Sequence, residues 1–159
     1  MAKIQIKYSD SLAQLFRRSS DRLLETRSLL ESIAKRLRYT FQKNITESAS
    51  PEGNAYAPLV KPIRKKVRKT ETRPLIDSGN LVNSFDYVFL GEKTVVVGDP
   101  THYGIYHQTG TKHVPKRSFI GIRPTDQQDL DYIVGNWAGW VFGIYDAPEA
   151  NVFLETKAI

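Results

Sequence analysis

The feature that most constrains the fold is a pair of apolar segments with period-two alternation on either side of a short turn. Phe85, Tyr87 and Phe89 share one parity, and after Gly91-Glu92-Lys93 the chain returns as Thr94-Val-Val-Val-Gly98. Alternating apolar residues that flank a short glycine-containing turn predict an antiparallel β-hairpin. The middle of the chain is therefore expected to build a sheet.

The N-terminal part predicts a short strand followed by two helices. Ile4, Ile6 and Tyr8 alternate as in a strand, and Ser9 or Asp10 is suited to cap a first helix. Ser19-Ser20-Asp21 is expected to end that helix and to cap a second, longer one. The apolar stripe of the second helix consists of Leu23, Leu30, Ile33, Ala34, Leu37 and Phe41, and Asn44 continues its seven-residue spacing. Such a stripe favours packing on a core over a coiled coil.

The C-terminal part predicts one more strand and a final helix. Residues 119–122 form an apolar segment that Arg123-Pro124 would end, and Thr125 and Asp126 are suited to cap the helix that follows. Residues 75–81 predict a turn that enters a short helix, with Asp77 or Ser78 as a cap and Gly79-Asn80 at positive φ. The expected fold is one α+β domain over residues 1–159, with an antiparallel sheet of about four strands packed against a long N-terminal and a C-terminal helix.

Composition limits the classes of protein to which the chain can belong. It has 159 residues and no cysteine, which fits one domain and excludes disulfides, thiolate zinc sites and cysteine nucleophiles. Its first residues lack the apolar core of a secretory signal, and no apolar run is long enough to span a bilayer. We therefore expect a protein that is made in a cytoplasm and has no membrane partner.

The net charge of +6 is concentrated in one place. Six of the nine residues from position 61 to position 69 are basic: Lys61, Arg64, Lys65, Lys66, Arg68 and Lys69. They lie in a segment, residues 46–74, that has little apolar pattern of its own and is expected to form a flexible loop. Two interpretations stay open, a solvated loop or a contact with DNA or an acidic protein. No aromatic residues alternate with the basic ones, which argues against a platform for single strands.

No motif in the sequence predicts catalysis or a cofactor. His102, His107 and His113 do not have the spacing of a metal site on a helix. Ser78-Gly79 lacks the setting of a nucleophile elbow, and the glycines near it do not form a phosphate-binding loop. The sequence therefore predicts no enzyme, no metal and no bound cofactor.

An ordered series of motifs adds a resemblance. The series is Gly53-Asn-Ala-Tyr-Ala-Pro-Leu59 before the basic run, then Leu75-Ile-Asp-Ser-Gly-Asn-Leu81, Val97-Gly98, Tyr103-Gly-Ile-Tyr-His-Gln-Thr-Gly110 and Pro115-Lys-Arg-Ser-Phe-Ile-Gly121. It resembles the phage virion morphogenesis family of tail-completion proteins, typified by the G protein of phage Mu, over about residues 20–135. Two positions depart from the family pattern, with Tyr56 in place of a frequent tryptophan and Gly104 in place of a common alanine.

The resemblance implies a structural, non-enzymatic protein of the virion, assembled in the cytoplasm of a bacterial host. Such a protein would act in tail completion or head–tail joining as a ring-forming subunit, with copies of itself and head-connector or tail proteins as partners. A basic module that binds nucleic acid non-specifically is the alternative. The motif residues expected to build the subunit are Gly79, Tyr103, His107, Gln108, Gly110, Arg117 and Phe119. Residues 140–159 are expected to form an interface arm that includes Trp140, Phe142 and Tyr145.

Overall fold

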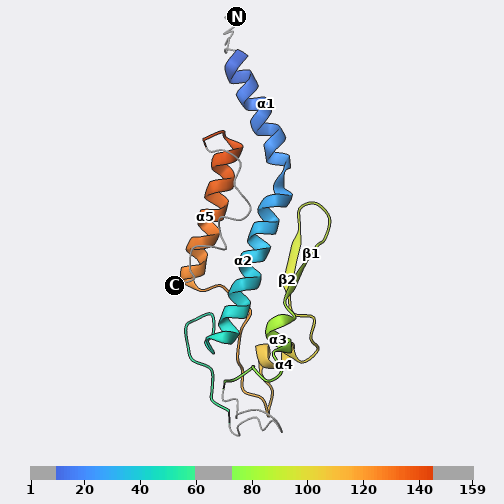
Figure 1. Cartoon of the computed structure of the whole chain (residues 1–159), viewed down its shortest axis with the longest axis vertical. Helices are drawn as coiled ribbons and strands as arrows, with labels where there is room; N and C mark the ends of the chain where they lie inside the picture. The colour runs from blue at the N-terminus through green and yellow to red at the C-terminus, as the bar shows by residue number, and fades with distance from the viewer. Residues whose placement is uncertain (1–9, 60–72, 145–159) are drawn as a thin grey trace, which may run out of the picture.

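The computed structural model describes residues 10–59 and 73–144 (Figure 1). Within these ranges the elements are α1 (Asp10–Leu24), α2 (Thr26–Thr46), α3 (Asn80–Asn83), β1 (Asp86–Phe89), β2 (Val95–Gly98), α4 (Gly104–Thr109) and α5 (Pro124–Val141). The strand expected at residues 4–8 lies outside the described residues. No helix in the described ranges has the length and apolar character needed to cross a membrane.

The two N-terminal helices follow one another along the long axis of the molecule. α5 lies along one side of this pair and the hairpin along the other (Figure 1). The predicted break at Ser19–Asp21 is wrong, because α1 continues through these residues and ends only before Glu25, whose ψ of 50° leaves the helical region. Serine and aspartate lower helix propensity by only about 0.5 kcal/mol each, and Ser19 is buried, so tertiary packing outweighs this preference.

The hydrophobic core gathers where the last turns of α2 meet α3 and the segment before α5. Its buried members are Phe41, Ile45, Tyr56, Leu81, Phe85 and Phe119. The aromatic ring of Phe85 lies at the centre, 5.9 Å from that of Phe41 and 5.8 Å from that of Phe119, in tilted and edge-on contacts. The predicted stripe of the long helix is thus confirmed in its C-terminal half, whereas Leu23 at its N-terminal end is 47% exposed.

The predicted hairpin is confirmed, and the register of its strands explains which residues it buries. Tyr87 pairs with Val97 and Phe89 with Val95, and these residues are partly buried on the side that contacts α2. The guanidinium of Arg27 lies 4.2 Å from the centre of the Phe89 ring. This hairpin forms the two-stranded sheet of the described residues, so about four strands are not confirmed.

The segment 119–122 was predicted to be a strand, but it has no strand neighbour. Side chains replace one. The Asn44 amide donates to the carbonyls of Phe119 (2.9 Å) and Gly121 (3.1 Å). The Gln108 amide accepts from the N–H groups of Phe119 (2.9 Å) and Ile120 (3.1 Å), and donates to the carbonyl of Ile120 (3.2 Å). Because its backbone groups are bonded in this way, the segment is held in place without joining the sheet, with Phe119 buried and Ile120 and Ile122 exposed.

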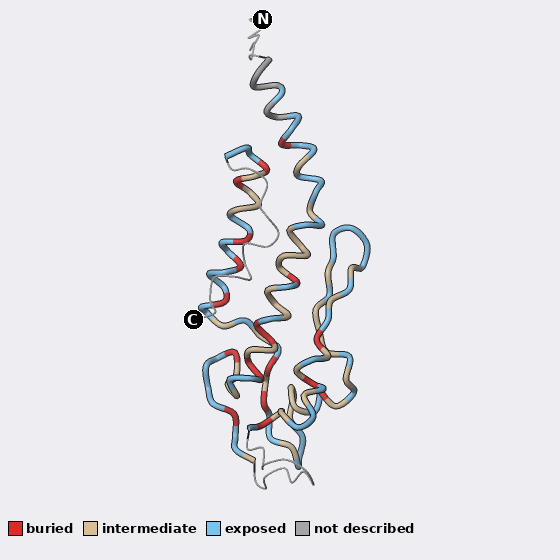
Figure 2. The backbone as a smooth tube through the Cα atoms, viewed as in Figure 1, coloured by how far each residue is buried: buried red, intermediate tan, exposed pale blue. Residues whose placement is uncertain are grey.

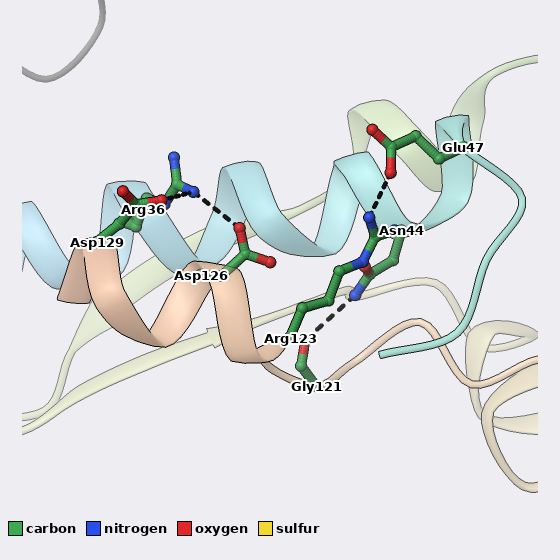
Figure 3. Close-up of polar contacts among 7 residues, drawn as sticks. All are labelled: Arg36, Asn44, Glu47, Gly121, Arg123, Asp126 and Asp129. Carbon is green, nitrogen blue, oxygen red and sulfur yellow. Dashed lines mark hydrogen bonds and ion pairs between the residues drawn. The ribbon is translucent and has the colours of Figure 1, made fainter. Parts of the chain in front are cut away.

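Ion pairs fasten the start of α5 to α2 (Figure 3). The guanidinium of Arg36 binds Asp126 at 2.8 Å and also binds Asp129, and Arg123 pairs with Glu47. The predicted cap at Thr125 or Asp126 is wrong, because α5 begins at Pro124 and its N-cap position makes no side-chain hydrogen bond. The Asp126 carboxylate is buried, and its Oδ1 atom accepts a hydrogen bond from Arg36, whereas its Oδ2 atom has no partner among the residues that the structure describes.

The end of α5 also corrects the prediction for the apolar segment after Gly139. The helix continues through Val141, so Trp140 is helical and belongs to the body of the protein. The Nη1 atom of Arg22 donates to the Trp140 carbonyl at 2.5 Å, and its guanidinium lies over the Trp140 ring. Phe142 follows the helix and is 56% exposed, and Tyr145 lies outside the described residues.

Candidate functional site

Four motif segments that are distant in the sequence meet around one cleft of about 350 Å³. Its lining comes from the end of the Tyr56–Leu59 element, from the turn before α3, from α4 and from the segment after it. The described lining residues are Leu59, Leu75, Asp77, Ser78, Gly79, Asn80, Leu81, Tyr103, His107 and Arg117. Four of these, Gly79, Tyr103, His107 and Arg117, were predicted as motif residues of the subunit.

The first wall is the turn that leads into α3. Gly79 has φ of +83°, which confirms the predicted left-handed position, and Leu75 takes φ of +67° without the freedom of a glycine. The Ser78 hydroxyl accepts a hydrogen bond from the N–H of Asn80 at 3.3 Å and so supports the turn, but the N-cap of α3 is Gly79. The predicted positive φ of Asn80 is wrong, because Asn80 is the first residue of the helix. The positive φ of Leu75 carries a local backbone cost of about 1 kcal/mol that the surrounding packing must offset.

The second wall is α4, which the Asp99 carboxylate holds in place. Asp99 accepts hydrogen bonds from the Ser84 hydroxyl at 2.6 Å, from the Thr101 N–H at 2.9 Å and from the Thr101 hydroxyl at 2.5 Å. A Cβ atom at Gly104 would lie 2.1 Å from the Asp99 carboxylate. The glycine at this position therefore makes room for the anchored carboxylate of this chain.

Arg117 connects the cleft to the chain that enters the basic segment. Its side chain is buried and donates from Nε to the Ala57 carbonyl at 3.1 Å and from Nη2 to the Pro58 carbonyl at 3.4 Å. Its backbone N–H donates to the His107 carbonyl at 2.8 Å. Burial lowers the pKa of Arg117, but a guanidinium remains charged at neutral pH.

His107 faces the same arginine and is half-buried. Burial, and then the positive charge of Arg117, lower the pKa of His107 below its ordinary value of 6.5, so the imidazole is neutral at pH 7. Its Nδ1 atom is buried and has no hydrogen-bond partner among the residues that the structure describes. His102 and His113 are exposed, and residues 10–59 and 73–144 contain no cluster of three metal-ligating side chains.

The remaining predicted residues fall into two groups. Gln108, Gly110 and Phe119 lie beside the cleft and build it, because Gln108 holds the backbone of Phe119 and Gly110 ends α4 with φ of +79°. The basic residues Lys61, Arg64, Lys65, Lys66, Arg68 and Lys69 lie outside the described residues.

Sequence reasoning missed several residues that shape the site. Asp99 stands in no motif of the sequence, and Leu75 gave no sign of a positive φ. Asn44 was placed on the apolar stripe of the helix, but its amide spans 75 residues of sequence to reach Phe119. The polar residue in an otherwise apolar stripe was the available signal, since a buried amide requires hydrogen-bond partners.

The comparisons with known proteins bear on the same motifs. The sequence model of the phage virion morphogenesis family matches residues 8–138, which include all four segments around the cleft. The chain belongs to this family. The resemblance seen in the sequence is thereby confirmed, and membership gives the protein a role in building phage particles. No curated protein and no solved structure matches the chain.

Proposed function

We propose that the chain is a structural, non-enzymatic subunit that completes the tail or joins head to tail, and that it acts as a ring of identical copies. The family match over residues 8–138 carries this proposal. The motif residues support it, because Gln108 and Arg117 use their side chains to hold neighbouring backbone in place. The motifs therefore serve to build a rigid body that presents surfaces to partners.

Exposed apolar side chains also lie far from the cleft, and they favour assembly with other chains. Leu24 is 80% exposed, Phe142 56% and Ile144 70%, and they lie where α1 gives way to α2 and where α5 ends. Single exposed apolar residues are common on monomers, but several large ones in one region are typical of an interaction surface. Copies of the chain and neighbouring head-connector or tail proteins are the proposed partners.

The proposal is tested with a phage that lacks the gene. Lysates of the deletion phage should contain heads and tails that do not form infectious particles, and the purified protein added to such a lysate should restore the plaque titre. Electron micrographs of the defective lysate should show tails with an unfinished head-proximal end or heads without tails. A deletion phage that yields a normal titre of complete particles would contradict the proposal.

The basic segment defines a separate test, because its contact with DNA or with an acidic protein is still a prediction. Changing Lys65, Lys66 and Lys69 together to glutamine should leave thermal unfolding unchanged and lower the plaque titre. The control changes Lys112 and Lys116, which are exposed elsewhere on the chain, to glutamine. DNA affinity that falls steeply with salt in the parent, and not in the triple variant, would favour the nucleic-acid-binding alternative. A normal titre for the triple variant would remove any role in assembly from these lysines.

A further inference from the structure

The hairpin of the protein has two open edges. The N–H of Leu90 donates to the Thr94 carbonyl at 2.9 Å, so this pair is hydrogen-bonded. In an antiparallel ladder bonded and non-bonded pairs alternate. The pairs Phe89–Val95 and Tyr87–Val97 are therefore non-bonded, and their N–H and C=O groups point away from the partner strand.

Within the part of the chain that the structure describes, one of these outward groups has a hydrogen-bond partner. The N–H of Tyr87 on β1 is bonded by its neighbour Asp86 at 2.9 Å. On β2, the structure of residues 10–59 and 73–144 shows no hydrogen bond from outside the hairpin to Val95 or Val97. In residues 10–59 and 73–144, β2 thus presents a row of backbone donors and acceptors that are free to pair with another strand.

The edge also lacks the usual protection. Natural edge strands are blunted by lysine, proline or a bulge, whereas Thr94-Val-Val-Val-Gly98 contains no charge and no proline. On the outer face Val88 is 60% exposed, Val96 50% and Leu90 61%. An uncharged, valine-rich edge beside an exposed apolar face is suited to pair with another strand.

Charge at the hairpin tip identifies the strand that fits. If β2 of one copy pairs antiparallel with β1 of the next, the hairpins line up with their tips at the same end. Lys93, on the β2 side of each tip, then faces the neighbouring tip, which carries Glu92 at its middle position, and both side chains are exposed. A two-fold pairing of identical edges would place the tips at opposite ends and lose this match.

We propose that the hairpin is the self-assembly element of the chain, with β2 of one copy adding to β1 of the next copy to form a continuous antiparallel sheet. The contact uses two different edges of the same hairpin, so it is heterologous, and a heterologous contact that closes gives a ring. The inference rests on the proposed ring-forming function and names the surface through which the ring forms.

The test removes one outward donor. Val95→Pro deletes an N–H that does not bond to β1, and proline is tolerated at such positions of an edge strand. Val95→Ala is the matched control, because it shortens the same side chain and keeps the N–H. In sedimentation of the full-length protein over a range of concentrations, the parent and Val95→Ala should self-associate and Val95→Pro should remain monomeric. Association of Val95→Pro equal to that of the parent, or a parent that is monomeric throughout, would overturn the proposal.

A second pair of variants covers the case in which proline disturbs the hairpin itself, which circular dichroism would reveal. Val96→Lys places a charge on the exposed face beside the edge, and Val96→Thr keeps the shape and the β-branching without charge. Val96→Lys should abolish association and Val96→Thr should retain most of it. Equal association of the two variants would count against the hairpin as the contact.

A charge exchange tests the order of the edges. Glu92→Lys alone and Lys93→Glu alone should each weaken association by up to about fivefold per junction, as expected for exposed ion pairs. The double exchange, and a mixture of the two single variants, should restore it. Failure of both to restore association would exclude the β2-to-β1 arrangement.

The inference and the proposed function can fail separately. If Val95→Pro is monomeric but the parent protein does not restore the plaque titre of the deletion phage, the hairpin contact is supported and the proposed role in phage assembly is contradicted. If the parent restores the plaque titre and Val95→Pro associates normally, the role in phage assembly is supported and the hairpin contact is contradicted.

Discussion

The two ends of the molecule use their apolar residues in different ways. At one end, which we call the motif end, α3, α4 and residues 115–121 close around the core beside the cleft. At the other, the open end, α1 projects past α5 and the hairpin (Figure 1), and Leu24 and Ile144 are 80% and 70% exposed. Figure 2 shows buried backbone gathered along the lower part of α2 and the segment beside it, whereas most of α1 described there is exposed. Stability is thus concentrated at the motif end, and surface for partners at the open end.

Polar side chains have different tasks at the two ends. At the motif end the side chains of Asn44 and Gln108 bond to the backbone of residues 119–121 in place of a neighbouring strand. Arg117 bonds to the carbonyl of Ala57 in the same region. At the open end the long-range polar link between α1 and α5 is the bond from Arg22 to the Trp140 carbonyl. Because buried backbone groups without partners are costly, the amides of the motif end are as necessary to its fold as the apolar core.

The largest expected effect tests whether the motif end holds the fold together. Phe119 is 1% exposed and packs against Phe85, so Phe119→Ala should lower the free energy of unfolding by about 3–5 kcal/mol. Urea titration would measure the loss. Ile120→Ala is the control, because Ile120 is 40% exposed and should lose much less. Equal stability of the parent and Phe119→Ala would show that the motif end does not hold the stabilising core.

A pair of glycine substitutions should shift stability in opposite directions. Gly110 has φ of +79° and ψ of 162°, a region for glycine alone, and an added Cβ would approach the Lys116 backbone to 3.1 Å. Gly110→Ala should therefore cost about 1–3 kcal/mol. Gly135 lies in α5 with nothing within 4 Å of an added Cβ, so Gly135→Ala should stabilise the helix by about 0.5–1 kcal/mol. Melting temperatures that move in the same direction for both variants would contradict this reading.

The outcome at these residues shows what the sequence can specify. Local signals succeeded: the hairpin follows from alternation around a turn, and Gly79 at positive φ follows from turn chemistry. Residues 119–122 looked like a strand because the same apolar pattern occurs in a strand and in an irregular segment that side chains hold in place. Which one forms depends on amides from Asn44 and Gln108, and no local pattern encodes those distant contacts.

For the candidate site, too, the sequence predicted individual residues but not their arrangement in space. Gly79, Tyr103, His107 and Arg117 were predicted as parts of three separate motifs, and their spacing in the sequence could not show that they meet around one cleft. The burial of Asp126 was likewise hidden, because its partner Arg36 lies 90 residues earlier in the chain. The role of Asp126 as the ion-pair partner of Arg36, and not as a helix cap, is therefore visible only in the folded structure.

A smaller effect should appear at the motif end when the pH is lowered. The folded protein holds the pKa of His107 below its ordinary value of 6.5, so the unfolded chain takes up a proton before the folded chain does. The free energy of unfolding should therefore decrease as the pH falls through 6.5 toward the lowered pKa. Melting temperatures at about pH 7.5 and about pH 5.5 would measure this, and His107→Gln should show a smaller loss than the parent. An equal or larger loss in His107→Gln would assign the acid sensitivity to other groups.

The smallest effect on stability is expected at the open end. Leu24 is 80% exposed at the last residue of α1, so Leu24→Gln should change the free energy of unfolding by no more than about 0.5 kcal/mol. Sedimentation and plaque titre should instead reveal a defect, because a polar side chain would be buried against a neighbour in the assembled particle. Leu81→Gln is the contrasting variant, since Leu81 is 4% exposed in the core. This change should lower the free energy of unfolding of the isolated chain. If Leu24→Gln destabilised the isolated chain as much as Leu81→Gln, the open end would be packed within the monomer, and exposure there would no longer indicate a surface for partners.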